Sequence, residues 1–350
     1  MFSNLRILYV GPLFAGSTAL HRMNALRDLD CFVSAIDTTL PFTRFGESGK
    51  INKCKRFFLS RTNNLLDWKC VHSRILNAAR AEKWDILWID KGQGLKPEIL
   101  TDFRKLQPSA KLVNYSPDDM FNPANQTDRY LSALDIYDLF VTTKSYNIAE
   151  FREAGVQDVF FVGNAYEPSI HKPFRLLEEE REQWRSDVVF VGAVEADRLR
   201  SLEFLAQQKI SLGLYGGGKA WQSLSELYAN VRSNCEFIAD QSYSKVLCAS
   251  SIALGFLRKQ NRDLQTTRSI EIPACGVFML AERTDEHLAL FDEGKEAEFF
   301  SSDEELWEKI RFYLKNVDKR EAIARAGRRR CLQSGYSNAE RLRLVLEYLV

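Results

Sequence analysis

The sequence RILYVG at residues 6–11 leads directly into PLFAGSTALHRMNALRDL at residues 12–29. The first segment is a nearly continuous apolar run that ends at a glycine, which is typical of a strand buried on both faces. In the second segment apolar residues recur at three-residue spacing from Leu20 to Leu29, and Ser17 can cap a helix that begins there. This stretch therefore predicts a strand, a glycine-containing loop and a helix.

The same alternation continues along the first half of the chain. Apolar runs predict strands at 31–37, 84–90, 110–116, 138–143 and 158–164, and periodic stretches predict helices at 73–83, 96–106, 128–137 and 145–155. Residues 38–72 are rich in charges and turn formers, and their pattern predicts no element. Strands that alternate with helices indicate an α/β fold with a doubly wound parallel sheet.

The pattern restarts at VVFVGA, residues 188–193, after a segment rich in proline and charge. Further strands are predicted within 210–218 and at 235–240, 251–257 and 277–282, and the remaining tail is helical. We therefore expect two Rossmann-like domains, at 1–167 and 187–335, joined by a linker at 168–186. A C-terminal helix at 336–350 is expected to pack back on the first domain.

The composition is that of an ordinary globular protein. Of 350 residues, 45% are hydrophobic and 27% charged, and the formal net charge of +1 favours neither nucleic acid nor an anionic membrane as a partner. The seven cysteines show no C-x-x-C spacing, so reduced thiols and a cytoplasmic location are expected rather than disulfides or a zinc site.

The N-terminal apolar run predicts a first strand rather than a secretion signal, because Arg6 and a Gly-Pro pair interrupt it. No uncharged stretch reaches the ~20 residues that a membrane-spanning helix needs. Peripheral contact with a membrane stays compatible with this pattern.

The loop from Gly11 to Gly16 has nearly the spacing of a phosphate-binding P-loop. Ser17 stands where that motif requires a lysine to reach the β- and γ-phosphates, which argues against an NTPase. Two interpretations remain. Either the loop presents backbone N–H groups to an anion at the start of the helix, or it is a tight turn that binds nothing.

The stretch TTRSIEIPACGVFMLAE at 266–282 carries the strongest functional signal. Arg268 and Glu271 are three residues apart, so on a helix they share one face. An arginine can hold a diphosphate with two hydrogen bonds, and a carboxylate can accept from ribose hydroxyls. RSIEIPACG at 268–276 is predicted to begin a helix, and Pro273, which is typical of a first helical turn, places the helix start near it. The alternative is a surface salt bridge.

This stretch resembles the C-terminal core of CgeB-like glycosyltransferases, the spore maturation protein B type, within the GT-B superfamily. The resemblance extends through LFDEGKEAEFFSSDEELWEKIRFYL at 290–314 and KREAIARAG at 319–327. In the first half, WDILWIDKGQGLKPEIL at 84–100, NYSPDDMFNP at 114–123, YDLFVTTK at 137–144 and NAYEPSIHKPF at 164–174 follow in the family's order. Residues before 84 match only generally.

The resemblance implies a GT-B fold and transfer of a sugar from a nucleotide-sugar, UDP- or GDP-linked, to an acceptor hydroxyl. It also implies retention of anomeric configuration, no metal or other cofactor, and a place in surface glycan or glycoconjugate synthesis. Arg198 and Arg268 would meet the leaving-group charge, Gly192 would allow close approach of the donor, and Glu271 would hold the ribose. The implied donor set is Gly11, Gly16, Gly192, Arg198, Arg268, Glu271, Ala274, Cys275 and Gly276.

The resemblance also nominates catalytic residues. Related retaining enzymes carry an acid eight residues before the ribose-binding glutamate, and this sequence has Asp263 there. Asp263 can equally be a solvated loop residue. His21, Asp118 and Asp119 are candidates for a general base on the acceptor side. For the histidine the alternative is a surface position, and for the aspartates a turn or helix cap.

Two other functions fit the same residues. One is a sugar-nucleotide epimerase of the same fold, which would need acid and base groups but no acceptor. The other is a catalytically silent scaffold in surface or spore-coat assembly. Expected partners of the transferase are the nucleotide-sugar and a glycan, lipid-linked or protein acceptor.

Overall fold

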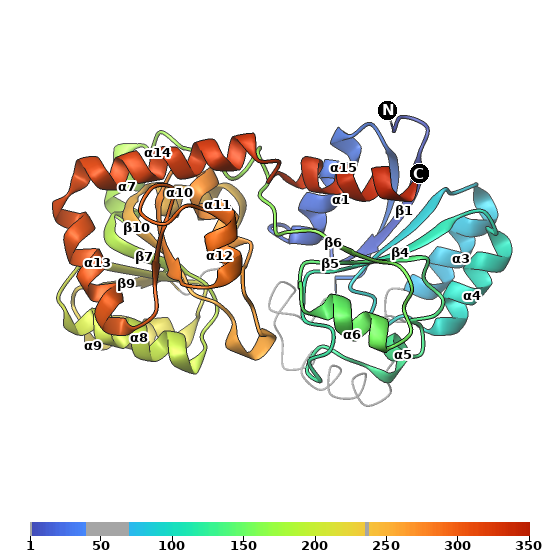
Figure 1. Cartoon of the computed structure of the whole chain (residues 1–350), viewed down its shortest axis with the longest axis horizontal. Coiled ribbons are helices and arrows are strands. Elements are labelled where there is room, and N and C mark those ends of the chain that lie inside the picture. The colour runs from blue at the N-terminus through green and yellow to red at the C-terminus, as the bar shows by residue number, and fades with distance from the viewer. Residues whose placement is uncertain (1, 40–69, 235–237) are drawn as a thin grey trace. The chain divides into compact units, whose positions relative to one another are not determined.

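The computed structural model describes residues 2–39, 70–234 and 238–350. The chain forms two compact units (Figure 1), unit 1 from Met1–Gly163 together with Asn338–Val350, and unit 2 from Asn164–Ser337. The charged segment predicted as a linker contains helix α7 (Glu178–Trp184), which lies in unit 2. Among the described residues no helix is both long and apolar enough to cross a membrane.

The described part of unit 1 is built on a six-stranded parallel sheet in the order β2-β1-β3-β4-β5-β6. In this sheet, Ile7 of the first strand pairs with Ile86 of the third. The strands are β1 (Arg6–Gly11), β2 (Phe32–Asp37), β3 (Ile86–Asp90), β4 (Lys111–Ser116), β5 (Leu139–Thr142) and β6 (Val159–Phe161). The doubly wound parallel sheet predicted from the alternating pattern is confirmed.

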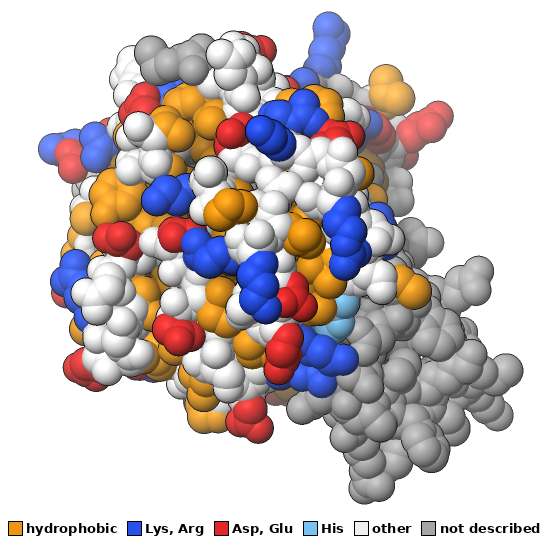
Figure 2. Space-filling model, turned by 90° about the vertical axis from the view of Figure 1, so that its right-hand side faces the viewer, with side chains coloured by type: hydrophobic (Ala, Val, Ile, Leu, Met, Phe, Trp, Pro, Cys, Tyr) orange, Lys and Arg blue, Asp and Glu red, His pale blue; other side chains and the backbone are white. Residues whose placement is uncertain are grey.

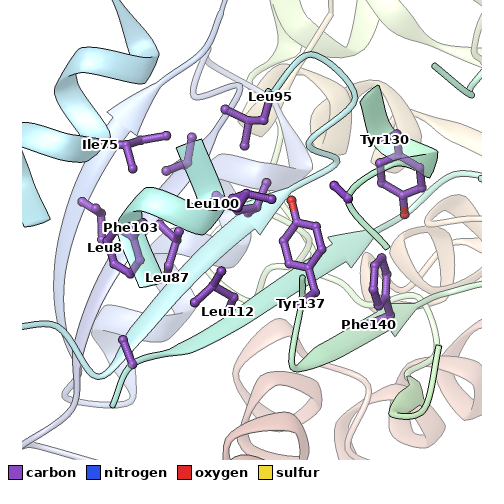
Figure 3. Close-up of a cluster of buried hydrophobic side chains, with 14 of the residues drawn as sticks. Leu8, Ile75, Leu87, Leu95, Leu100, Phe103, Leu112, Tyr130, Tyr137 and Phe140 are labelled. Carbon is purple, nitrogen blue, oxygen red and sulfur yellow. The ribbon is translucent and has the colours of Figure 1, made fainter. Parts of the chain in front are cut away.

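Helices cover both faces of this sheet. They are α1 (Thr18–Asp28), α3 (Val71–Ala81), α4 (Pro97–Leu106), α5 (Asp128–Leu131), α6 (Asn147–Glu153) and α15 (Asn338–Leu349). Leu8 and Val10 of β1 face the core beneath α3 and α4 (Figure 3), whereas Ile7 and Tyr9 face the core shared by α1 and α15. This two-sided burial explains why β1 reads as a nearly continuous apolar run.

Unit 2 repeats the plan with the strand order β12-β11-β10-β7-β8-β9, all parallel. Its described strands are β7 (Ser186–Val191), β8 (Leu212–Tyr215), β9 (Val231–Asn234), β10 (Ser250–Gly255), β11 (Phe278–Glu282) and β12 (Glu298–Phe300). The strand predicted at 235–240 lies partly outside the described residues, and β9 ends just before it.

The described helices of unit 2 also lie on both faces of the sheet. Leu202, Leu224 and Leu306 place α8, α9 and α13 on one face, and Val246 and Ile270 place α10 and α11 on the other. The remaining bounds are α8 (Ala196–Gln207), α9 (Lys219–Leu227), α10 (Asp240–Cys248), a 3-10 turn (Lys259–Asn261), α11 (Arg268–Ala274), α12 (Asp285–Leu290), α13 (Asp303–Lys315) and α14 (Val317–Gln333).

The start predicted for the helix near Pro273 is wrong. Helix α11 begins at Arg268, and Pro273 lies inside its last turn. The chain turns into this helix through Thr266 and Thr267, and the N–H of Thr266 donates to the Ser269 hydroxyl at 3.0 Å. A local turn closed by hydroxyl residues therefore starts the helix, not the proline.

Strand order locates one switch point in each unit. From β1 the chain builds outward to β2 and then continues at β3 on the other side, and from β7 it builds outward to β8 and β9 before returning at β10. Ligands of open α/β sheets bind outside the carboxyl ends of the strands at such points. Ligand sites are therefore expected at the β1/β3 edge of unit 1 and the β7/β10 edge of unit 2.

Candidate functional site

Arg198 lies at the β7/β10 edge of unit 2 and is only 3% exposed. Its guanidinium donates to the carbonyl oxygens of Leu257 at 3.2 Å and Ala193 at 3.1 Å, so it bridges the segments that follow the two strands. Burial, together with the positive charge of Arg268, lowers the pKa of Arg198 to about 10. The side chain still carries its charge at neutral pH.

Arg268 brings a second cation to this edge. It is the first residue of α11, and its guanidinium carbon lies 5.8 Å from the centre of the Phe190 ring. Its Nε is buried and has no hydrogen-bond partner in the structure. Buried N–H groups are nearly always paired in folded proteins, and Arg328 also has a buried, unpaired Nε, so this feature supports an anion site at Arg268 only together with the neighbouring Arg198.

Glu271 lies one turn further along α11 and is 7% exposed. One carboxylate oxygen accepts from the Tyr243 hydroxyl at 2.9 Å, and the other lies 3.7 Å from Nε2 of His171. Nδ1 of His171 accepts from the Glu167 N–H at 2.9 Å, which assigns the imidazole proton to Nε2. Burial and the neighbouring Glu271 raise the pKa of Tyr243 well above its ordinary value, so the phenol remains a donor.

Sequence reasoning missed Tyr243 and His171. His171 lies in the motif NAYEPSIHKPF, but nothing in this motif indicates that the side chain contacts Glu271. Tyr243 precedes Glu271 by 28 residues and comes from α10, so only the packing of α10 against the sheet shows the contact.

Asp263 is buried rather than solvated, which rules out the solvated-loop alternative. It is 9% exposed and accepts from the Asn261 amide at 2.9 Å. Its negative charge acts on the pKa of Arg198, so it shares the electrostatic environment of the arginine pair.

Gly192 has a packing reason to be glycine. A Cβ there would lie 2.6 Å from the Phe190 ring, so any larger residue would displace the ring. The structure places Ala274, Cys275 and Gly276 at the far end of α11, one turn beyond Glu271 and directly before β11. We therefore leave these three residues out of the proposed donor contacts.

At the β1/β3 edge of unit 1, close packing also explains why residue 11 is a glycine. A Cβ on Gly11 would lie 2.9 Å from the Asp90 Cβ. Gly16 takes a positive φ of 78°, and Ser17 caps α1 by accepting from the Leu20 N–H at 3.1 Å. The Ser17 hydroxyl also donates to the Pro12 carbonyl at 2.8 Å, so the loop is held as a closed turn.

A buried ion pair lies next to this turn. Arg22 donates two hydrogen bonds to Asp90, at 2.9 and 3.0 Å, and the Tyr9 hydroxyl donates to the same carboxylate at 2.8 Å. Both charged side chains are almost fully buried. The pair joins α1 to the end of β3, and sequence analysis did not identify it.

The predicted acceptor-side residues fall into different environments. His21 is buried in α1, so the surface alternative is wrong for it. Asp119 is fully buried and accepts from Asn147 at 3.0 Å and from the Phe121 N–H at 3.1 Å, which is the contact pattern of a turn. Asp118 is partly exposed and pairs with Lys91 at 2.5 Å.

A cavity of about 350 Å³ opens within unit 1 at the β1/β3 edge. Its lining does not include His21, Asp118 or Asp119, although Lys91 forms part of its wall. The Thr127 hydroxyl donates to the Gln93 carbonyl at 2.6 Å and so joins two segments of the wall. The lining residues are Val10, Pro12, Thr38, Ile89, Asp90, Lys91, Gly92, Gln93, Gly94, Leu95, Ala124, Gln126, Thr127 and Arg129.

Part of the chain is similar to a known protein family. Residues 185–347 match the family described as glycosyl transferase-like. No curated protein sequence matches the chain.

Solved structures match over almost the whole length. Sucrose-phosphate synthase from Thermosynechococcus elongatus has a TM-score of 0.69 at 12% identity, covering 99% of this chain and 98% of its own. Anabaena HepE in complex with UDP and glucose has a TM-score of 0.65 at 13% identity, covering 99% of both chains. An α-glucosyltransferase in complex with UDP has a TM-score of 0.64 at 12% identity, covering 99% and 100%.

At these identities the solved structures establish the fold, and the family match shows a similarity over residues 185–347. The expected GT-B fold is therefore confirmed, while the CgeB-like subtype stays a prediction. Residues 185–347 thus resemble the glycosyl transferase-like family, and the chain as a whole has the GT-B fold.

Proposed function

We propose that this protein is a retaining, metal-independent glycosyltransferase that uses a UDP- or GDP-linked sugar. The observation that carries the proposal is the arginine pair at the β7/β10 edge, where Arg268 keeps a buried N–H without a partner one helical turn from Glu271. Solved structures of the same fold include HepE with UDP-glucose, which favours a nucleotide-sugar as the ligand of this edge.

Each residue has a proposed task. When the bond between the anomeric carbon and the diphosphate breaks, negative charge builds on the leaving phosphate, and Arg268 with Arg198 would stabilise it. Glu271 would accept from the ribose hydroxyls, with Tyr243 and His171 fixing the orientation of its carboxylate. Asp263 would lie on the sugar side, eight residues before Glu271. Two fixed cations can meet the leaving-group charge, which is why we propose a reaction without a metal.

On the acceptor side, the proposal concerns unit 1. Asp118 is the best-placed of the proposed bases, because its carboxylate is 22% exposed and pairs with Lys91 of the cavity wall. The new bond forms between the anomeric carbon and an acceptor oxygen, whose proton passes to a base or to the departing phosphate. We propose a surface glycan, lipid-linked or protein acceptor and a cytoplasmic location.

Nucleotide binding tests the donor site. Thermal-shift and calorimetric titrations with UDP, GDP, ADP, CMP and dTDP would compare the wild type with Glu271→Ala, because a ligand of the folded state raises the melting temperature. One nucleotide that stabilises the wild type but not the variant supports the proposal. If none binds, the donor site is wrong and a scaffold role becomes the better explanation.

The finer claims need product analysis. With the donor identified, NMR of the product tests retention directly, and activity measured with a chelator present tests metal independence. Conversion of the donor sugar to its epimer in the absence of any acceptor would instead identify an epimerase.

A further inference from the structure

Two cysteines meet where α10 and α11 end. Cys248 is the last residue of α10, and Cys275 is the C-cap of α11. The Cys248 sulfur lies 3.7 Å from the Cys275 carbonyl oxygen and 3.8 Å from that of Lys172. Both are free thiols in the structure, with Cys275 buried and Cys248 half-buried. Cys248 is thus the more exposed of the two thiols.

The two thiols are chemically unequal. A hydrogen bond with the Cys275 thiol lowers the pKa of Cys248, and the Phe174 N–H lowers it further. Burial raises the pKa of Cys275 well above its ordinary value, as does the same hydrogen bond. Cys248 is therefore the more acidic of the two thiols and the better nucleophile.

Cys248 is also reachable from solvent. It lines two cavities of about 330 and 460 Å³ at the end of the sheet where β10 and β11 begin. Arg181 lines both cavities, Arg175 and Arg185 line the first, and Arg320 lines the second. Glu321 also lines the second cavity, so four arginines and a carboxylate border the space through which a small oxidant can reach the thiol.

The same two helices carry the proposed donor contacts. Tyr243 on α10 donates to Glu271 on α11, and each residue lies about one helical turn from its helix's cysteine. The helices are thus joined at two levels, by a hydrogen bond at the site and by the thiol pair below it. A covalent bond at the lower level would fix the spacing that the upper contact depends on.

We propose that Cys248 and Cys275 form a reversible disulfide when the protein meets a hydroperoxide, and that this bond changes nucleotide binding at Glu271. The Cys248 thiolate attacks the peroxide oxygen, the O–O bond breaks, and a sulfenic acid and an alcohol or water result. The Cys275 thiol then attacks the sulfenic sulfur, forms the S–S bond and releases water. The two sulfurs lose two electrons in total, and the peroxide gains them.

Peptide mapping tests the bond without reference to function. The full-length protein is treated with hydrogen peroxide, remaining thiols are alkylated, and the chain is cut with trypsin without reduction. The expected product joins VLCASSIALGFLR (246–258) to SIEIPACGVFMLAER (269–283), each with one cysteine. Reduction should release both peptides.

Matched variants identify the reacting pair. Cys248→Ser should abolish the cross-link, whereas Cys70→Ser, which removes an exposed thiol of unit 1, should leave it unchanged. Over-oxidation of Cys248 without any cross-link would overturn the proposal, as would a cross-link that joins other cysteines.

The second half of the inference rests on the proposed function. Nucleotide affinity should differ by ~5-fold or more between oxidised and reduced wild type, and Cys248→Ser should show no such difference. Equal affinities in cross-linked and reduced protein would refute the coupling. If reduced protein binds no nucleotide, the proposed function fails, while peptide mapping still decides whether the disulfide forms.

Discussion

Both units are built on parallel sheets in their described residues, but the charged side chains at their switch points differ. In unit 1, Arg22 and Asp90 neutralise each other inside the β1/β3 edge, with hydrogen bonds at 2.9 and 3.0 Å. In unit 2, Arg198 donates to backbone carbonyls and lies 3.9 Å from the Glu195 carboxylate, and Arg268 adds a second cation with a buried, unpaired N–H. The charges at the β1/β3 edge therefore neutralise each other, whereas the β7/β10 edge keeps an arginine N–H that can bind an anion.

The surface of unit 1 fits this picture. On the face seen in Figure 2, Lys and Arg side chains are interspersed with Asp and Glu side chains among the described residues. The two signs of charge are thus mixed on this face, in keeping with the chain's formal net charge of +1. The cavity of unit 1 is lined by apolar side chains together with the charged Asp90, Lys91 and Arg129, so it offers a ligand both kinds of contact.

The largest effect is expected from disrupting the Arg22–Asp90 ion pair at the β1/β3 edge of unit 1. Arg22→Ala leaves the buried Asp90 carboxylate uncompensated and should lower the free energy of unfolding by about 3–5 kcal/mol. Urea denaturation measures this. Lys105→Ala, which removes the exposed pair with Asp102, is the matched control and should give no measurable change. An Arg22→Ala loss as small as the control's would show that the buried pair does not stabilise unit 1.

Removing Arg268 from the β7/β10 edge of unit 2 should instead affect nucleotide binding. Arg268→Ala should weaken nucleotide affinity by about 10- to 100-fold, because a hydrogen bond to a charged partner is lost, and leave the unfolding midpoint nearly unchanged. Arg200→Ala, which removes an exposed arginine of α8, serves as the control in the same calorimetric titration. Equal affinities in the two variants would remove Arg268 from the site.

A smaller effect is expected one contact away from the ligand. Tyr243→Phe removes the hydroxyl that donates to Glu271 at 2.9 Å while keeping the ring in place. Nucleotide affinity should fall by about 2- to 10-fold. Calorimetry of this variant and of Glu271→Ala compares the two losses of nucleotide affinity. The loss should be smaller for Tyr243→Phe than for Glu271→Ala. A loss as large as that of Glu271→Ala would mean that the tyrosine itself contacts the ligand.

The smallest effect concerns pH. Burial lowers the pKa of His287 below its ordinary value of 6.5, and Nε2 of this residue lies 2.6 Å from the Ser269 hydroxyl of α11. The unfolded chain therefore binds this proton more readily, so the stabilising contribution is present above pH 6.5 and is lost as the pH falls below it. Thermal unfolding of His287→Gln should depend less on pH in that window than the wild type does. Parallel curves would contradict this assignment.

Local signals explain what the sequence could predict. The bounds of β1 follow from one apolar run, and the start of α1 follows from Ser17, whose hydroxyl caps the helix as expected. Strand β12 was missed because Glu298–Phe300 is only three residues long and begins with a charge. Pro273 misled the placement of α11, because its preference for a first turn was outweighed by the hydroxyl-closed turn before Arg268.

Only those site residues that lie within one short motif could be predicted from the sequence. Arg268 and Glu271 lie three residues apart, so their shared helix face could be read directly. Asp90 lies 68 residues from Arg22, and Tyr243 lies 28 residues before Glu271. Contacts at such separations depend on strand order and helix packing, which no local pattern contains.

The most direct test of the account is a calorimetric comparison of nucleoside diphosphates with their parent nucleosides on the wild-type protein. If the β7/β10 edge holds a diphosphate through its arginines, one diphosphate should bind at least about 100-fold more tightly than its nucleoside. Equal binding of the two, or binding of neither, would contradict the claim that this edge is an anion site.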